Sequence, residues 1–186
     1  MKIGICGKMA SGKTTVANHL VEKYGFKTRS LAAPVKHIGK WLFGNETKDR
    51  KLLQQIGMKM REIDEDVWLD YLIRDTESEG LFVVDDVRFI NEAKQLKEHG
   101  WVLVKLEITP ELQRDRLKRT YGVAWESHAN RSNDPSEAEV SQIADELFDL
   151  IIEVDDGDSV FEKLDTQYGT DLSGHGSNAT YEPSAR

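Results

Sequence analysis

The stretch Gly7-Lys8-Met9-Ala10-Ser11-Gly12-Lys13-Thr14 decides the fold of this chain. It matches the pattern G-x-x-x-x-G-K-[ST], in which a glycine-rich loop lies between a buried strand and a helix. The apolar run Lys2–Cys6 predicts the strand, and the helical spacing of apolar residues over Thr14–Tyr24 predicts the helix. Both flanks therefore provide the context that the motif requires.

The residue types in this loop suit a chain of phosphates. Glycine at positions 7 and 12 lets the backbone curl so that successive N–H groups converge on phosphate oxygens, and the helix N-terminus adds partial positive charge. Lys13 is expected to act catalytically on the β- and γ-phosphates, and the Thr14 hydroxyl to bind Mg²⁺. A glycine-rich turn without a ligand is the alternative, which the matching flanks disfavour. We therefore predict ATP and Mg²⁺ as ligands, held by Gly7, Lys8, Ala10, Ser11, Gly12, Lys13, Thr14 and Thr15.

Length, charge and cysteine content restrict the class of protein. The 186 residues suit one domain, with 39% hydrophobic and 31% charged residues. Lys and Arg number 25 against 33 Asp and Glu, and the net charge of −8 argues against stable binding of nucleic acid. The single cysteine, Cys6, fits a reducing compartment. No apolar stretch approaches the ~20 residues of a membrane span, and no signal peptide precedes the first predicted strand. We therefore expect a cytoplasmic protein that is not attached to a membrane.

Strand-like and helix-like segments alternate along the chain. Further strands are predicted over Lys27–Leu31, Leu81–Val84, Trp101–Ile108 and Leu150–Val154. Further helices are predicted over Pro34–Phe43, Asp49–Glu62, Asn91–His99, Pro110–Tyr121, Ser136–Leu147 and Ser159–Leu164. This alternation predicts an α/β fold whose parallel sheet carries helices on both faces. The polar stretch Gly122–Pro135 predicts a mobile loop, and residues 166–186 predict a polar C-terminal tail that is flexible or packed on another surface.

A second group of candidate residues follows the apolar run Leu81–Val84. In an α/β sheet, ligands bind beyond the carboxyl ends of the strands, so Asp85, Asp86 and Arg88 are expected at the reaction site. Asp85 is the candidate for holding Mg²⁺, and Asp86 for orienting the acceptor of the phosphate during catalysis. Arg88 is the candidate for binding a phosphate through two guanidinium nitrogens and for catalysis. The alternative is that the two carboxylates cap a helix or face solvent, with Arg88 as their ion-pair partner.

The charged segment Arg114–Arg119 carries cations on more than one helix face, so only some of them can touch one ligand. On a lid over the triphosphate they would stabilise charge during transfer and exclude water. Arg116 is the candidate for catalysis and Arg119 for ATP binding, and a solvated face paired with acids of the same helix is the alternative. Trp68 is expected in the core, with stacking on a base as the alternative.

In their order along the chain, these residues resemble the phage-type deoxynucleoside monophosphate kinases, a branch of the P-loop nucleotide kinases. The resemblance spans about residues 1–165. Beyond the P-loop, the matching pieces are Leu31-Ala32-Ala33-Pro34-Val35-Lys36, Leu53-Gln54-Gln55-Ile56-Gly57 leading through Arg61 to Trp68, Asp86-Val87-Arg88-Phe89 with Asn91 and Glu92, Glu126-Ser127-His128, and Phe148-Asp149-Leu150-Ile151-Ile152 with Asp155, Asp156 and Gly157. Each piece is short, and their order makes the resemblance specific.

The resemblance implies a three-layer fold with a five-stranded parallel sheet and a kinase domain over residues 1–165. The arginine-rich helix at residues 114–119 is instead similar to the lids of general nucleotide kinases, and it predicts a small lid at about residues 114–133. The family resemblance also implies transfer of the γ-phosphate of ATP to a deoxynucleoside monophosphate, which yields the diphosphate for DNA precursor synthesis. Lys36, Arg61 and Arg88 fall where that family holds its acceptor, and Trp68 and Asp86 complete the candidate acceptor site. A phage-encoded protein of this kind would work in the host cytoplasm.

Other interpretations of the same residues stay open. A P-loop kinase could phosphorylate another acceptor, such as dephospho-coenzyme A or a hydroxymethylated base in DNA, although the acidic chain disfavours DNA. A nucleotide-binding regulatory module that hydrolyses ATP slowly or not at all is the third interpretation. Acceptor-dependent formation of ADP separates both kinases from this module. A homodimer is as compatible with these patterns as a monomer.

Overall fold

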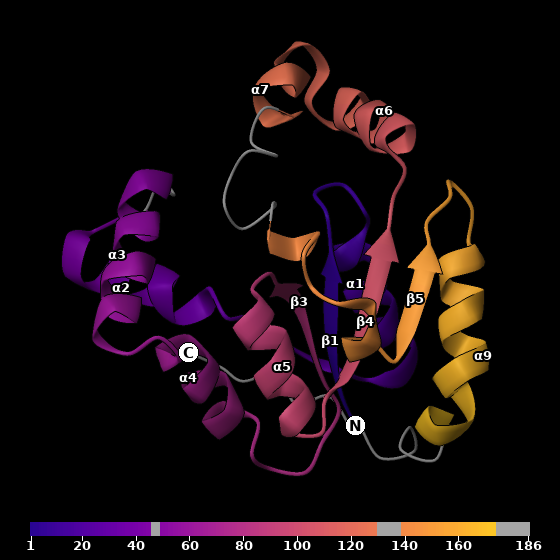
Figure 1. Cartoon of the computed structure of the whole chain (residues 1–186), viewed down its shortest axis with the longest axis horizontal. Coiled ribbons are helices and arrows are strands. Elements are labelled where there is room, and N and C mark those ends of the chain that lie inside the picture. The colour runs from indigo at the N-terminus through magenta and orange to yellow at the C-terminus, as the bar shows by residue number, and fades with distance from the viewer. Residues whose placement is uncertain (46–48, 130–138, 174–186) are drawn as a thin grey trace.

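Five parallel strands in the order β2-β3-β1-β4-β5 form the sheet of the computed structural model, which describes residues 1–45, 49–129 and 139–173 (Figure 1). The strands are β1 (Lys2–Gly7), β2 (Lys27–Arg29), β3 (Phe82–Val87), β4 (Val102–Glu107) and β5 (Leu150–Glu153). The helices are α1 (Lys13–Tyr24), α2 (Ala33–Phe43), α3 (Arg50–Ile63), α4 (Val67–Asp75), α5 (Ile90–Glu98), α6 (Pro110–Tyr121), α7 (Trp125–Ala129) and α9 (Ser159–Ser173). Two 3-10 helices are η1 (Gly122–Ala124) and η3 (Asp145–Leu147). Within the described ranges, none of these helices combines the length and apolar character needed to cross a bilayer.

The two faces of the sheet carry separate hydrophobic cores, because side chains alternate across a strand. Ile5 of β1 and Leu106 of β4 belong to the core under α1 and α9. Cys6, the next residue of β1, and Leu103, three residues before Leu106 on β4, point to the opposite face and belong to the core under α5 and the segment α2–α4. In Figure 1, α5 lies in front of the sheet and α1 behind it, with α9 beside β5. The chain therefore has the three-layer α/β fold with a five-stranded parallel sheet that the sequence predicts.

β3 runs further than its apolar residues predict, and its end is irregular. The sequence predicts an end at Val84, but the strand includes the next three residues. Gly4 of β1 pairs with Val84, and Cys6 pairs with Val87, so one residue of β1 stands opposite two residues of β3. Because of this bulge, Val84 and Val87 both face the core under α5, although a regular strand would turn them to opposite sides. The two aspartates between them are thereby left for polar partners.

Two predictions for the segment after α6 are wrong in part. Residues 122–129 form η1 and α7 instead of the loop predicted over Gly122–Pro135, and residues 130–135 lie outside the described ranges. The helix predicted over Ser136–Leu147 is not continuous, because the described part is helical only at residues 139–140 and, as η3, near its end. Val140 and Ile143 are buried in the core under α5, and their spacing of three residues resembles a helical pattern.

The predicted lid, at about residues 114–133, corresponds to most of α6 together with η1 and α7. These three elements contact one another and lie beyond the carboxyl ends of the strands, at the top of Figure 1. Residues 130–133 of the predicted lid lie outside the part of the chain that the structure describes.

α9 continues past the predicted domain boundary. The sequence predicts a helix over Ser159–Leu164 and a polar tail from Thr166, yet the helix reaches Ser173. Tyr168 and Leu172 are 8% and 1% exposed, and they continue the four-residue spacing of the apolar residues earlier in the helix. The boundary at residue 165 is therefore wrong, because this apolar stripe packs on the sheet. Residues 174–186 of the predicted tail lie outside the described residues.

A polar cluster also fixes α9 to α1. Asp165 accepts hydrogen bonds from Lys23 Nζ at 2.6 Å and from the Tyr24 hydroxyl at 2.6 Å, and its Oδ1 atom lies 3.0 Å from His19 Nε2. Partial burial by itself raises the pKa of Asp165, but these hydrogen bonds have the larger effect and lower the pKa to about 2. The carboxylate is therefore ionised at neutral pH and adds a charged contact to the apolar stripe.

Replacing Leu172 by alanine is expected to lower the free energy of unfolding by about 2–3 kcal/mol, because a buried leucine loses its packing and leaves a cavity. Thr170→Ala, at an exposed position of the same helix, is the matched control and is expected to change it by less than about 0.5 kcal/mol. Urea denaturation followed by circular dichroism measures both. A Leu172→Ala protein as stable as the control would contradict the packing of α9 described here.

Candidate active site

The loop between β1 and α1 depends on its glycines. Gly12 precedes α1 with a φ of 94°, and Ala10 also has a positive φ, of 64°. A Cβ atom on Gly7 would lie 2.7 Å from the carbonyl oxygen of Leu106 on β4, so a larger residue does not fit there. The loop therefore has the curled backbone through which P-loops cradle phosphate oxygens.

Lys13 and Thr14 begin α1 and make polar contacts on either side of the loop. The Lys13 ammonium donates hydrogen bonds to the carbonyl oxygens of Gly7 at 2.6 Å and Lys8 at 2.9 Å. The Thr14 hydroxyl donates a hydrogen bond to Asp85 Oδ2 at 2.6 Å. A hydroxyl beside a carboxylate supplies the oxygen ligands that Mg²⁺ prefers, so these residues fit the metal expected at a P-loop. The structure thus brings together the two predicted metal ligands.

A cavity of about 570 Å³, here called the donor cavity, opens between the P-loop, α6 and the turn from β5 to α9. Arg119 Nη2 contacts the two carboxylate oxygens of Asp156 at 3.0 and 2.9 Å. Arg116 contacts Asp156 at 3.2 Å and donates a hydrogen bond to the Ala10 carbonyl oxygen at 3.2 Å. The hydrogen bonds from Arg119 and Arg116 lower the pKa of the Asp156 carboxyl. Arg116 and Arg119 of the lid both line the donor cavity, and both bind Asp156 rather than an acid of α6.

A second cavity, of about 600 Å³, lies between the segment α2–α4 and the turn from β3 to α5, and is here called the acceptor cavity. It is lined by all the residues that the sequence assigns to acceptor binding, Lys36, Arg61, Trp68, Asp86 and Arg88. These residues come from four elements and the turn after β3, so they meet only in the folded chain. Leu53, Met58 and Phe89 contribute apolar surface to its walls. Cations beside apolar walls suit an anionic ligand with a flat organic body.

Asp86 acts as a hydrogen-bond acceptor for the loop that leads into α2. Its carboxylate accepts hydrogen bonds from Ser30 Oγ at 2.6 Å and from the backbone N–H groups of Leu31 and Ala32, each at 3.1 Å. These bonds fix the rim of the acceptor cavity. These N–H groups precede the first residue of α2, so Asp86 binds the loop before the helix, and its catalytic role stays a prediction.

Trp68 belongs to the core, as the sequence predicts. It is 4% exposed, and its indole Nε1 donates a hydrogen bond to the Gly57 carbonyl oxygen at 3.2 Å. This bond joins α4 to α3 across the acceptor cavity, of which Trp68 forms one wall.

Three residues of this region have no role in the sequence prediction. Asp156 holds the lid arginines, Glu92 is buried beside the acceptor cavity, and Gln113 of α6 donates a hydrogen bond to the Met9 carbonyl oxygen of the P-loop at 2.8 Å. Asp156 and Glu92 lie inside motifs that carry the family resemblance, and this position could have marked them as candidate site residues. Gln113 lies in none of these motifs.

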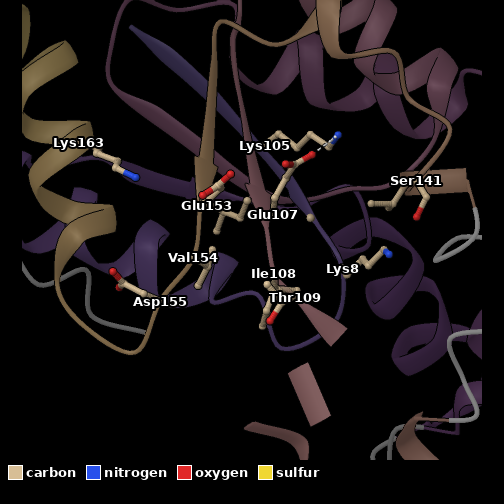
Figure 2. Close-up of a pocket in the computed structure, with 13 residues that line it drawn as sticks. Lys8, Lys105, Glu107, Ile108, Thr109, Ser141, Glu153, Val154, Asp155 and Lys163 are labelled. Carbon is tan, nitrogen blue, oxygen red and sulfur yellow. Dashed lines mark ion pairs between the residues drawn. The ribbon is translucent and has the colours of Figure 1, made fainter. Parts of the chain in front are cut away.

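A third cavity, of about 570 Å³, lies at the carboxyl ends of β4 and β5, on the other side of Gly7 and Lys8 (Figure 2). Lys105 in its lining pairs with Glu107 at 2.7 Å, the ion pair dashed in Figure 2, and with Asp145 at 2.6 Å. Lys105 therefore has acidic partners on two sides. Among the predicted site residues, Gly7 and Lys8 line this cavity, whereas the candidate acceptor residues line the acceptor cavity.

Solved structures share this arrangement of strands and helices. A shikimate kinase from Acinetobacter baumannii, solved with shikimate, is 22% identical with a TM-score of 0.56, over 92% of this chain and 94% of that chain. A gluconokinase from Sinorhizobium meliloti is 17% identical with a TM-score of 0.55, over 94% of this chain and 93% of that chain. These likenesses confirm the P-loop kinase fold.

Sequence relatives define the family. A family described as an AAA domain matches residues 3–140. A protein of Acanthamoeba polyphaga mimivirus named "Putative deoxynucleotide monophosphate kinase" is 30% identical, over 56% of this chain and 72% of the viral protein. The chain therefore belongs to this AAA-domain family of P-loop kinases. It is a phosphotransferase that uses a nucleotide.

Replacing Lys13 by alanine is expected to reduce phosphoryl transfer by about 100- to 1,000-fold, because a preorganised donor at the phosphates is lost. The melting temperature is expected to stay near the wild-type value, because the Lys13 side chain is only half-buried and its removal leaves no core cavity. Lys94→Ala makes the same change at an exposed position of α5 and is the control. Wild-type turnover by the Lys13→Ala protein would contradict the assignment of the loop.

Proposed function

We propose that the protein transfers the γ-phosphate of ATP, with Mg²⁺, to a deoxynucleoside monophosphate. The observation that carries the proposal is the pair of carboxylates at the end of β3. Asp85 accepts a hydrogen bond from Thr14 of the P-loop, whereas Asp86 holds the rim of the acceptor cavity. Donor and acceptor sites therefore adjoin at one strand end, and direct transfer requires reacting atoms about 3–3.5 Å apart.

The donor side supplies positive charge and excludes water. Lys13 and the N–H groups of the P-loop would bind the triphosphate, and Mg²⁺ at Thr14 and Asp85 would neutralise charge on its β- and γ-phosphates. Arg116 and Arg119 line the donor cavity from the lid, where they would stabilise charge that spreads during transfer. Positioning and electrostatics account for this catalysis, because phosphoryl transfer needs little covalent participation by side chains.

The acceptor side fits a small anion attached to a planar base. Lys36, Arg61 and Arg88 provide positive charge, and Trp68 and Phe89 provide aromatic surface. An arginine can bind a phosphate through two parallel hydrogen bonds, which fixes both the position and the direction of the attacking oxygen. The name of the viral relative supports a deoxynucleoside monophosphate as this acceptor.

The other interpretations are less consistent with this geometry. A regulatory module that only binds ATP has no need of a second cavity lined by cations. Duplex DNA carries dense negative charge, and a chain with a net charge of −8 repels it. We place the reaction in the cytoplasm and treat small nucleotides as its substrates.

A panel of the four deoxynucleoside monophosphates, each with ATP and Mg²⁺, tests the proposed function. ADP release that depends on at least one of them, with the matching diphosphate identified by chromatography, is the expected result. A rate of ADP release that none of the four monophosphates changes would identify a slow ATPase instead. Dephospho-coenzyme A is assayed in the same way, and ADP release with this compound alone would support a kinase with a different acceptor.

Replacing Arg88 by lysine is expected to raise the KM of the monophosphate by about 10- to 150-fold and to leave the KM of ATP unchanged. A lysine keeps the charge but cannot reproduce the two parallel hydrogen bonds of a guanidinium, a loss of about 1.5–3 kcal/mol. Steady-state kinetics with each substrate varied separately measure both constants. Arg74→Lys, at an exposed position of α4, is the control. Equal effects on both substrates would contradict an acceptor role for Arg88.

A further inference from the structure

Glu92 is a buried carboxylate that the proposed reaction does not use. It lies in the first turn of α5, is 4% exposed and lines the acceptor cavity. Its Oε2 atom accepts hydrogen bonds from the backbone N–H groups of Arg88 at 2.9 Å and Phe89 at 3.1 Å. Its Oε1 atom accepts a hydrogen bond from Arg61 Nη2 at 3.1 Å. One carboxylate therefore binds both segments that bring arginines to the acceptor cavity.

The contact with Arg61 joins parts of the fold that are far apart in sequence. Arg61 lies in the last turn of α3, and its guanidinium also lies over the Phe89 ring, 4.6 Å from the ring centre. The first turn of α5 binds this region a second time, because Asn91 Nδ2 donates a hydrogen bond to Asp66 Oδ1 at 3.1 Å. Arg61 is thus held between a carboxylate and an aromatic ring, which fixes the direction of its guanidinium.

Burial makes the charge of Glu92 sensitive to its surroundings. Loss of water raises the pKa of Glu92 to about 7, although the backbone N–H groups of Arg88 and Phe89 and the charge of Arg61 oppose the rise. Asp86 adds to the rise by repulsion. The groups that face Glu92 are therefore Arg61 from α3, Asp86 from β3, the backbone of residues 88–89 and the buried Cys6 thiol of β1. Burial raises the pKa of Cys6 to about 11, so this thiol stays neutral over the pH range in question. Near neutral pH, the Glu92 side chain changes between a form that attracts Arg61 and a form that does not.

We propose that Glu92 is a positioning residue of the acceptor site, whose ionised carboxylate holds Arg61 in the direction that an anionic acceptor needs. Without this contact, an incoming anion must order the Arg61 side chain itself, which weakens binding. The inference rests on the proposed function, because the anion is taken to be the phosphate of a deoxynucleoside monophosphate. It predicts that acceptor binding weakens as pH falls through neutrality.

Glutamine at position 92 separates the contact with Arg61 from the contacts with the backbone. Its amide oxygen can still accept hydrogen bonds from the N–H groups of Arg88 and Phe89, so the start of α5 keeps its partner. Its NH₂ group then faces the Arg61 guanidinium, and two donors form no hydrogen bond. Glu92→Gln therefore copies the protonated form of Glu92 within the same fold.

Calorimetric titration of the full chain with a deoxynucleoside monophosphate tests the proposal. At pH 8.5, the Glu92→Gln protein is expected to bind about tenfold more weakly than wild type, because a charge-assisted contact is lost. The ratio of the two dissociation constants is expected to fall toward one at pH 6, where wild-type Glu92 is protonated. This ratio cancels the titration of the ligand phosphate. Glu98→Gln, at an exposed position of α5, is the matched control with unchanged binding.

An Arg61→Met background separates positioning from a general structural effect. If Glu92 acts through Arg61, then Glu92→Gln changes binding by less than about twofold in this background. A loss that persists there, or a ratio that does not change with pH, would overturn the proposal. If the Glu92→Gln protein does not fold, the Arg61→Met protein alone tests the positioning role of Glu92. The ratio of its dissociation constant to that of wild type is expected to fall as the pH is lowered. A ratio that stays constant with pH would contradict the proposal.

The proposed function is judged separately, from the formation of the diphosphate. A wild-type protein that binds a monophosphate in the pH-dependent manner described, but does not phosphorylate it, would support the role of Glu92 and contradict the proposed function. A wild-type protein that binds none of the four monophosphates would contradict both.

Discussion

The bulge at the end of β3 is the constraint on which the site depends. Val84 and Val87 are both buried under α5, and the extra residue between them leaves Asp85 and Asp86 side by side at the strand end. Asp85 then reaches Thr14 of the P-loop, and Asp86 reaches the loop before α2. Packing of two valines thereby fixes a carboxylate at each of two neighbouring sites.

The first turn of α5 connects the parts around this strand end. Glu92 and Asn91 bind the region of α3 and α4, and the backbone N–H of Ile90 donates a hydrogen bond to Glu139 Oε1 at 3.0 Å, on the segment that follows the lid. On the other side of the P-loop, Asp156 binds two arginines of α6. Side-chain contacts that charge and protonation can alter therefore join both cavity-lining segments, α3–α4 and α6, to neighbouring parts of the fold.

Charge distribution explains how an acidic chain can bind phosphates. The net charge is −8, but cations lie together around the donor and acceptor cavities. The donor side has Lys13, Arg116 and Arg119, and the acceptor side has Lys36, Arg61 and Arg88. Carboxylates hold several of these cations in fixed directions, so a ligand meets an ordered set of donors instead of a diffuse positive surface. Preorganisation of this kind is the main source of electrostatic stabilisation in phosphoryl transfer.

The sequence by itself determined the features whose cause lies within a few consecutive residues. The P-loop is one of them, and so is α6, which begins at Pro110 after the Thr109 cap and has the predicted bounds. The apolar spacing that extends α9 to Ser173 is also present in the sequence, but the polar residues around Tyr168 made this pattern hard to recognise. Only the tertiary structure decided the bulge in β3, the pairing of Asp156 with the lid, and the contact between Glu92 and Arg61. These depend on strand register and on partners tens of residues away, which no local pattern specifies.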